Sequence, residues 1–429
     1  MDARAADTTS DPAGSPFRYP GWRMVLVGLV CMTITFGIPI SVLPLVYNEV
    51  MKEFGWTMTQ ATFAFSLKQW TMALISLLIV APFVEKLGLR AMMITSCVVT
   101  GAAMMSFLLI DSLWSYNLAV LSLGFGQAFT IIGVKILISR WFTRRQGFAV
   151  GIALAGSSFG GSIFPLMFTG IADDFGWRAA MAGLSLTIWL IVLPIYLLIA
   201  RENPTDEEIA PESVTTDSNA TFAALKQADG GPAIGQILRS PAFWCAGFGI
   251  AIISAVDGGM FQHTALYVEK DLGFGKGAAA GAISITFALG VVAKIGAGWV
   301  FDRLSIRGVQ LWWVLVVAAV LLAFAVQNAA TLALFVVLRG LAHGGLVADS
   351  PVIAKHSFGP RELNKVLPFF TFFLGLGGGL GPLLLAMSHD HFHSYTVGFL
   401  AAAAFGLLAI ALLAFVPPTY RNQILQQSK

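Results

Sequence analysis

Charged residues are scarce in this sequence. Aspartate, glutamate, lysine and arginine together make up 11% of its 429 residues, whereas 57% are hydrophobic. A water-soluble protein of this length needs far more polar surface, so that class of protein is excluded. Apolar stretches of about 20 residues, the length that crosses a bilayer, recur along the whole chain. We therefore predict an integral membrane protein that contacts the lipid bilayer.

Cysteine is equally scarce, and its three copies, Cys31, Cys97 and Cys245, all fall within apolar runs. We expect them to pack as small residues, because their positions suit neither a disulfide framework nor a metal site. The net charge of +3 is spread over the loops and gives no indication of nucleic-acid binding. The polar segment before Gly21 lacks an apolar core followed by a cleavage site, so the first helix is expected to act as an uncleaved insertion signal.

Motifs that carry enzymatic chemistry are also missing. The chain has no nucleotide-binding loop, nucleophile elbow or metal cluster at a plausible place, so we predict neither an enzyme nor a bound cofactor. Alternating histidines occur once, at His389, His391 and His393. Such a tract in a turn is more often solvated polar chain than a metal site, and we predict no metal.

Apolar runs between charged or Gly/Pro-marked breaks predict an all-α fold with twelve transmembrane helices. An acidic stretch with prolines, serines and threonines at 201–240 predicts a cytoplasmic linker. It divides the chain into an N-terminal six-helix bundle (1–200) and a C-terminal six-helix bundle (241–429), each with a short cytoplasmic tail. The predicted helices are 22–47, 60–84, 89–110, 115–139, 147–171, 178–200, 241–268, 278–301, 308–327, 330–353, 366–387 and 394–416.

Lysine and arginine set the predicted orientation, because cytoplasmic loops of membrane proteins are rich in both. If the N-terminus is cytoplasmic, the inner side receives most of these residues. The outer loops then hold only Lys52, Arg178, Lys270 and Lys276. We therefore expect a multi-pass protein of the cell inner membrane with both termini cytoplasmic, and we expect it to be a monomer.

The two halves repeat each other at one fixed separation in sequence, which we call the repeat offset. It is the separation between Glu85 in "APFVEKLGLR" and Asp302 in "GWVFDRLSIR". The same offset carries Asp173 in "FPLMFTGIADDF" onto Asp390 in "GPLLLAMSHDHF". Two separate loops that agree on one offset indicate parallel structural repeats.

With these loops the chain resembles the major facilitator superfamily, which carries an acidic and basic loop motif after helix 2 and a weaker copy after helix 8. Within it, "RWFTRRQGFAVGIALAGSSFGGSIFP" (140–165) and the stretch from Asp390 to Tyr395 look like the oxalate/formate-type and monocarboxylate-type anion transporters. The resemblance implies two six-helix bundles that alternate access to a site between them. The glycines of helices 5 and 11 are expected to allow close helix packing rather than to cradle a phosphate; they are Gly147, Gly151, Gly156, Gly160, Gly375, Gly377, Gly378, Gly379 and Gly381.

Six ionisable side chains remain inside the predicted spans, and such residues are costly enough to suggest a function. They are Lys68, Lys135, Lys294, Arg339, Asp257 and Asp349. The excess of two positive charges suits an anionic substrate. Lys294 and Arg339 lie near mid-depth, where a long side chain is least able to reach the interface.

Substrate binding is assigned first to Lys294 and Arg339. The resemblance implies a basic residue, usually arginine, at the position of Lys294, where it meets the substrate carboxylate. Lys68, in the outer half of helix 2, is expected to bind substrate or close the outer gate, and a structural role is equally open. Aromatic and polar residues are expected to complete the site; they are Phe261, Gln262, His263 and His343.

Asp257 is the leading candidate for proton coupling, because a carboxyl group in apolar surroundings can take up and release a proton near neutral pH. A permanent ion pair with Lys294 or Arg339 is the alternative. Asp349 is the second candidate. Gating is assigned to the loop pairs Glu85 with Lys86 and Asp302 with Arg303, and to Lys135, for which snorkelling to the cytoplasmic interface is equally open.

The predicted function is a secondary transporter that takes up organic carboxylates, either monocarboxylates or aromatic carboxylates, together with protons. An anion exchanger or exporter of the same fold is the first alternative. A transporter-like receptor is the second, and the short linker and tail leave it no large cytoplasmic domain.

Overall fold

Helices make up nearly all of the chain that the structure describes. The computed structural model describes residues 19–142, 146–205, 234–346, 349–358 and 363–416, and these residues contain no strand. Most of the predicted linker, 206–233, lies outside them. The predicted all-α membrane fold is confirmed.

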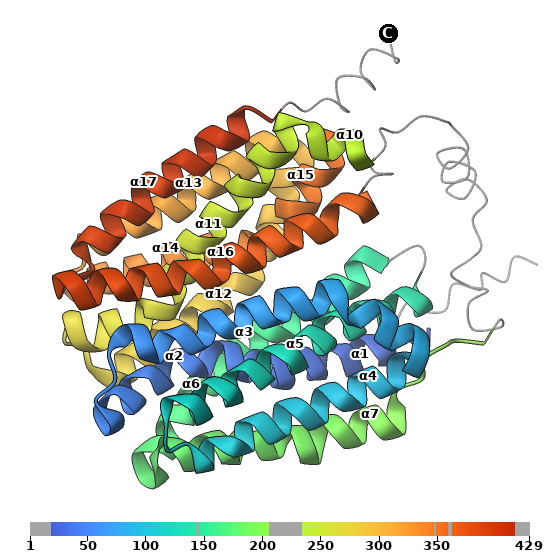
Figure 1. Ribbon diagram of the computed structural model, residues 1–429, viewed down its shortest axis with the longest axis horizontal. Coiled ribbons are helices and arrows are strands. Elements are labelled where there is room, and N and C mark those ends of the chain that lie inside the picture. Colours follow the sequence, from blue (N-terminus) through green and yellow to red (C-terminus); the bar gives the residue numbers. More distant parts are fainter. Residues whose placement is uncertain (1–18, 143–145, 206–233, 347–348, 359–362, 417–429) are drawn as a thin grey trace, which may run out of the picture.

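The first half of the chain forms one group of helices, which lies on one side of the molecule (Figure 1). Its elements are α1 (Gly21–Cys31), η2 (Met32–Phe36), α2 (Gly37–Phe54), α3 (Met58–Leu78), α4 (Val80–Met105), η3 (Ser106–Leu109), α5 (Leu113–Trp141), α6 (Gln146–Thr187), η4 (Ile188–Val192) and α7 (Leu193–Ile199).

The second half forms a matching group on the other side (Figure 1). Its elements are α10 (Ile234–Arg239), α11 (Pro241–Leu266), η5 (Tyr267–Asp271), α12 (Gly275–Leu304), α13 (Ile306–Ala323), α14 (Ala329–Gly345), α15 (Asp349–Phe358), α16 (Leu363–Phe392) and α17 (Tyr395–Ala414). The two groups meet where α3 packs on α16 and where α6 packs on α12.

Nine helices of the described chain are long and apolar enough to cross a membrane, and the bent pair α14 and α15 counts as a tenth. One of the nine, Ala149–Ile199, has 51 residues. At 1.5 Å per residue it is about 75 Å long, more than twice the ~30 Å hydrocarbon core, so it cannot be a single crossing. Its backbone turns at Gly176, where φ is 83°. The count of twelve crossings stays a prediction.

The backbone follows the same repeat offset. Gly88 and Gly176 have positive φ in the first half. Within the described chain two non-glycine residues have positive φ, Ser305 and His393, and the repeat offset carries Gly88 onto Ser305 and Gly176 onto His393. Each pair marks the turn at one end of corresponding helices. Parallel repeats therefore share their turn geometry, even where the second half places a side chain in a conformation that glycine adopts more easily.

The packing of the repeats depends on glycine at close helix contacts. A Cβ at Gly160 on α6 would overlap the carbonyl oxygen of Thr33 on η2, and one at Gly377 on α16 would overlap that of Ala251 on α11. The repeat offset also relates Gly160 to Gly377. The expected packing role is confirmed at these positions, whereas Gly151 has nothing within 4 Å of a Cβ and so does not share it.

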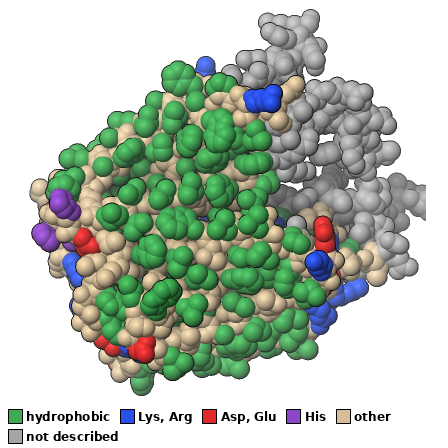
Figure 2. Space-filling model, viewed as in Figure 1, with side chains coloured by type: hydrophobic (Ala, Val, Ile, Leu, Met, Phe, Trp, Pro, Cys, Tyr) green, Lys and Arg blue, Asp and Glu red, His purple; other side chains and the backbone are tan. Residues whose placement is uncertain are grey.

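Hydrophobic side chains cover the middle of the face seen in Figure 2, and charged side chains gather towards its two ends. This distribution is typical of a membrane protein whose central part lies in the hydrocarbon core of the bilayer and whose two ends reach the aqueous phase. The chain is therefore a multi-pass membrane protein.

Candidate functional site

A buried cluster of charged side chains joins α11 to α14. Asp257 on α11 accepts a hydrogen bond of 2.6 Å from Nη1 of Arg339 through Oδ1, and one of 2.8 Å from Nδ1 of His343 through Oδ2. Nη2 of Arg339 also donates to the carbonyl oxygen of Asp257, at 2.7 Å. Arg339 and His343 are four positions apart, so they lie on one face of α14 and reach the same carboxylate.

The cluster compensates the cost of burying its charges. The side chain of Arg339 is 1% exposed and that of Asp257 is 10% exposed. Their opposite charges cancel, and each carboxylate oxygen has a donor, which a buried ion pair needs in order to be tolerated. The structure thus shows the ion pair that the sequence left open, with Arg339 as the partner rather than Lys294. Two of the five N–H donors of Arg339 bind Asp257, and its Nε has no hydrogen-bond partner within the described structure, so its substrate-binding role stays a prediction.

The imidazole ring of His343 packs against two phenylalanine rings. The ring of Phe261 stacks on it with centroids 4.9 Å apart and planes inclined by 8°. The ring of Phe287 on α12 meets it edge-on at 5.9 Å, and also meets Phe261 at 5.2 Å. Phe261, predicted from the sequence, and Phe287, not predicted, therefore form one aromatic wall beside the charged cluster.

Lys294 lies on α12 at the contact with the first group of helices. Its Nζ donates a 2.6 Å hydrogen bond to Oγ of Ser158 on α6. No carboxylate forms an ion pair with it among the side chains that the structure describes. Lys294 therefore carries a positive charge that the described protein groups around it do not cancel.

Close packing brings together the helix segments that carry Lys294 and His343. A Cβ at Gly344 would lie 2.6 Å from the Cβ of Ala293 and 2.8 Å from the Cα of Gly290. A Cβ at Gly290 would in turn lie 3.7 Å from Oγ of Ser158. Ala293 precedes Lys294 and Gly344 follows His343. The backbones of Lys294 and His343 therefore lie beside this one contact between α12 and α14.

Lys68 and Gln262 are also buried, and no described contact joins either of them to the side chains of Asp257, Arg339 and His343. Lys68 is fully buried on α3, its Nζ lies 4.5 Å from the ring centroid of Phe65, and it has no hydrogen-bond partner within the described structure. Gln262 accepts a 2.7 Å hydrogen bond from Tyr47 on α2. The Gln262 contact joins the two groups of helices. Lys68 makes no such contact within the described structure, and its role stays a prediction.

Two further predicted residues, Asp349 and His263, have hydrogen-bond partners outside the cluster. Asp349 begins α15, is 1% exposed, and accepts hydrogen bonds from Trp313 (3.1 Å) and Ser350 (3.0 Å). His263 is buried between Tyr395 and the carbonyl oxygen of Pro382, at 2.9 Å from each. Both ring nitrogens of His263 have partners, which suits a packing role. Asp349 has two neutral donors and no cationic partner among the described side chains, and its proton-coupling role stays a prediction.

The predicted gating residues are found at the surface or lie outside the description. Glu85, Lys86 and Lys135 are exposed. Arg303 is exposed too, and its guanidinium lies 4.0 Å from the ring centroid of Trp299 on the same helix. The side chain of Asp302 falls outside the described part of the structure. The gating role of these residues stays a prediction.

One end of the molecule is closed by polar contacts between the two groups. We call it the sealed end; it consists of the C-terminal ends of α2, η5 and α16 and the N-terminal ends of α3 and α12. Here Asp390 accepts hydrogen bonds from the backbone N–H groups of Met58 (3.1 Å) and Thr59 (2.8 Å), the first residues of α3. A carboxylate at a helix N-terminus is favourable because it meets unpaired donors and the positive end of the helix dipole.

Further ion pairs strengthen the sealed end. Lys276 pairs with Glu49 at 2.7 Å, and Lys52 pairs with Glu269 at 3.6 Å. Asn48 also donates a hydrogen bond to Glu269. Lys52 and Lys276 are two of the four residues that the charge distribution assigned to the outer loops, so the sealed end is the predicted outer end.

Sequence reasoning missed Ser158, Phe287 and Tyr47. Ser158 lies in "GSSFGG", where two adjacent hydroxyls interrupt an apolar helix, and that signal was available. Phe287 and Tyr47 are single aromatic residues in aromatic-rich spans. Nothing local distinguishes them from ordinary packing residues.

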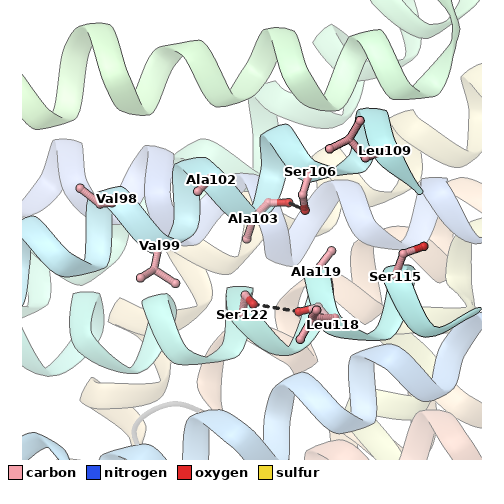
Figure 3. A pocket seen from close by; sticks show the side chains of 10 residues that line it. All are labelled: Val98, Val99, Ala102, Ala103, Ser106, Leu109, Ser115, Leu118, Ala119 and Ser122. Atoms are coloured by element: carbon pink, nitrogen blue, oxygen red, sulfur yellow. Dashed lines mark hydrogen bonds between the residues drawn. The ribbon is translucent and has the colours of Figure 1, made fainter. Parts of the chain in front are cut away.

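A hollow of about 420 Å³ lies between α4 and α5, away from the charged cluster (Figure 3). Its lining is mostly aliphatic. The hydroxyls of Ser106 and Ser122 bond carbonyl groups of their own helices, Ala103 at 2.7 Å and Leu118 at 2.8 Å. It offers no charged group to a ligand, so it is not the candidate site. No group of three or more potential metal ligands occurs in the described residues.

Comparison with known proteins identifies relatives over most of the chain. Residues 25–330 match the family described as Major Facilitator Superfamily. Monocarboxylate transporter 13 of Rattus norvegicus is 25% identical over 339 residues, which cover 77% of this chain and 74% of that protein. The same transporter of Bos taurus is 23% identical over 337 residues, with the same coverage.

A solved structure shares the fold. It is a bacterial homologue of the human lysosomal transporter Spinster in an inward-facing and occupied conformation, with a TM-score of 0.71 and 16% identity. The alignment covers 94% of this chain and 97% of that one.

Proposed function

The chain belongs to the Major Facilitator Superfamily, and on that premise we propose that it is a secondary active transporter of organic carboxylates, coupled to protons. Relatives named monocarboxylate transporters over three quarters of the chain support the substrate class. The single observation that carries the proposal is Lys294, a cation between the two groups of helices whose described partner is the neutral hydroxyl of Ser158.

The charge count of the site favours a substrate with one carboxylate. Asp257 and Arg339 cancel each other, and a neutral His343 adds nothing. Lys294 leaves a formal charge of +1, which one carboxylate neutralises. The aromatic wall of Phe261 and Phe287 beside it would accept an apolar or aromatic body on the same substrate.

The transport cycle follows from the two groups of helices. We propose that residues 1–200 and 241–429 rock against each other around Lys294, linked by residues 201–240. The sealed end would face outward, with both termini in the cytoplasm and the protein in the inner membrane. Opening it requires breaking the contact of Asp390 with α3 and the ion pairs of Lys276 and Lys52.

An exchanger or exporter is the second candidate, and the ion pair of Asp257 favours it. A carboxylate already held by Arg339 and His343 does not need a proton to be stable. In that case substrate would exchange for substrate without a pH gradient.

The test is transport by the purified full-length chain in proteoliposomes. A thermal-shift screen of pyruvate, lactate, oxalate and benzoate first selects a carboxylate that stabilises the protein. We expect its accumulation when the outside is more acidic than the inside, and its counterflow without a gradient. Counterflow alone would favour the exchanger, and the absence of both for every carboxylate would refute the proposed substrate class.

A further inference from the structure

We propose that the coupled proton is carried by Nε2 of His343 and not by Asp257. The inference rests on the proposed function, because it names the residue that links protons to carboxylate transport. It follows from how the three side chains of the cluster share their hydrogen bonds.

Asp257 is poorly placed to exchange a proton. Its Oδ1 faces Nη1 of Arg339 at 2.6 Å, and its Oδ2 faces Nδ1 of His343 at 2.8 Å. Adding a proton would displace one of these donors and leave the 1% exposed guanidinium of Arg339 without its counter-ion. Removing one partner of a buried ion pair is strongly destabilising, because the other charge stays buried and uncompensated. Asp257 therefore serves as a fixed negative charge.

His343 is placed to take the proton instead. To donate to Asp257, Nδ1 must carry hydrogen, so the lone pair of the neutral ring lies on Nε2. The side chain is 22% exposed, the most accessible of the three. Protonation adds an N–H bond at Nε2 and breaks no contact, because Nδ1 keeps its bond to Asp257.

Two groups beside the ring can accommodate a positive charge on it. The carboxylate of Asp257 is 2.8 Å away, and the face of Phe261 stacks on the imidazole at 4.9 Å. An aromatic face attracts a cation above it. The opposing charges are the guanidinium of Arg339, already neutralised by Asp257, and the ammonium of Lys294 on α12. From α6 the described polar group nearest to this contact is the hydroxyl of Ser158.

The location explains how a proton and a substrate can be coupled. A proton on His343 raises the formal charge of the site from +1 to +2 next to Lys294, which strengthens binding of an anion. By linkage, the bound anion strengthens proton binding by the same factor. With one carboxylate and one proton the site returns to +1, the charge of the empty site. The loaded and empty forms then cross the membrane field with equal charge, whereas substrate alone would change it.

The experiment compares the pH dependence of carboxylate binding in the wild-type protein and in His343→Asn. The asparagine amide can still donate to Asp257 from the position of Nδ1, but it cannot take up a proton. The ligand is whichever of pyruvate, lactate, oxalate or benzoate the wild-type protein binds. We expect wild-type affinity to change by up to tenfold per pH unit, and substrate binding to take up one proton, measured with a pH-sensitive dye in weak buffer.

In His343→Asn we expect the affinity to vary less than twofold from pH 5.5 to 8, with no proton uptake. Accumulation driven by a pH gradient should be lost, while counterflow remains. His391→Asn, a change of an exposed histidine at the sealed end, is the matched control and should behave as wild type. If His343→Asn is not folded by thermal unfolding, His343→Gln takes its place, and the proton uptake of the wild-type protein is compared with it.

The outcomes separate the inference from the proposed function. Wild-type levels of proton uptake in the histidine variant would overturn the inference alone and return the proton to Asp257 or Asp349. Carboxylate binding without any pH dependence in the wild-type protein would overturn proton coupling as well. No binding of any tested carboxylate would overturn both.

Discussion

Replacing Lys294 with glutamine tests the anion site directly. The glutamine amide can still hydrogen-bond to Ser158, so the change removes the charge while keeping a polar contact across the two groups of helices. Truncating one partner of a desolvated charge pair costs about 2–5 kcal/mol. At about 1.4 kcal/mol per tenfold change, carboxylate binding should weaken by roughly 30-fold to 4,000-fold.

Protein stability should respond in the opposite sense. Lys294 has no carboxylate partner among the described side chains, so its removal leaves no buried anion behind and relieves the cost of desolvating an ammonium. We therefore expect an equal or higher midpoint of thermal unfolding for Lys294→Gln. A structural ion pair would give the reverse, a clear loss of stability.

The assay is isothermal titration of the purified protein with the carboxylate selected by thermal shift. Ser158→Ala is the matched control, because it removes the hydrogen bond and leaves the charge; we expect affinity to fall by less than about tenfold, since water can replace one hydroxyl. Unchanged affinity in Lys294→Gln would refute the reasoning, and the anion site would then have to be sought at Lys68 or Arg339.

Three further predictions concern the charged cluster, the sealed end and the backbone. Arg339→Met should destabilise the protein by about 3–5 kcal/mol, because it leaves Asp257 with a single donor; adding Asp257→Leu should recover most of the loss in thermal unfolding. Asp390→Ala should weaken the sealed end by about 1–2 kcal/mol and shift spin-label distances between the two groups towards separation, whereas Asp390→Asn, which can still cap α3, should shift them less. Ser305→Gly should raise the free energy of unfolding by about 1 kcal/mol, because φ is 55° there; a loss of stability would show that its side-chain contacts matter more.

The fold could be predicted from the sequence because its main determinants are local. An apolar run long enough to cross a bilayer must form a helix, since hydrocarbon offers its backbone no other hydrogen-bond partner. Helix ends are less well determined, for a related reason. The apolar runs predict that helix 1 stops at residue 47 and that helix 11 spans 366–387, but α2 continues to Phe54 and α16 runs from Leu363 to Phe392. The hydropathy of the side chains falls where a helix leaves the hydrocarbon core, whereas the backbone hydrogen bonds within the helix continue beyond that point.

The repeat was also readable from the sequence, because corresponding loops keep corresponding charges at one offset. The sequence could likewise name the side chains that are costly inside a membrane, since each of them stands out from its own apolar neighbours. It thereby found Asp257, Lys294, Arg339 and Lys68 one by one.

The pairing of these charges was decided by the tertiary structure alone. Asp257 had two possible partners in the sequence, and the choice of Arg339 over Lys294 depends on how α11, α12 and α14 are rotated about their axes. That rotation is set by contacts such as Gly344 against Gly290 and Ala293, which join helices far apart in the chain. The sequence of a single helix is enough to locate a charged residue within the membrane. Its counter-ion lies on a different helix, so only the packing of the two helices determines whether a cation is paired or remains free to bind an anion.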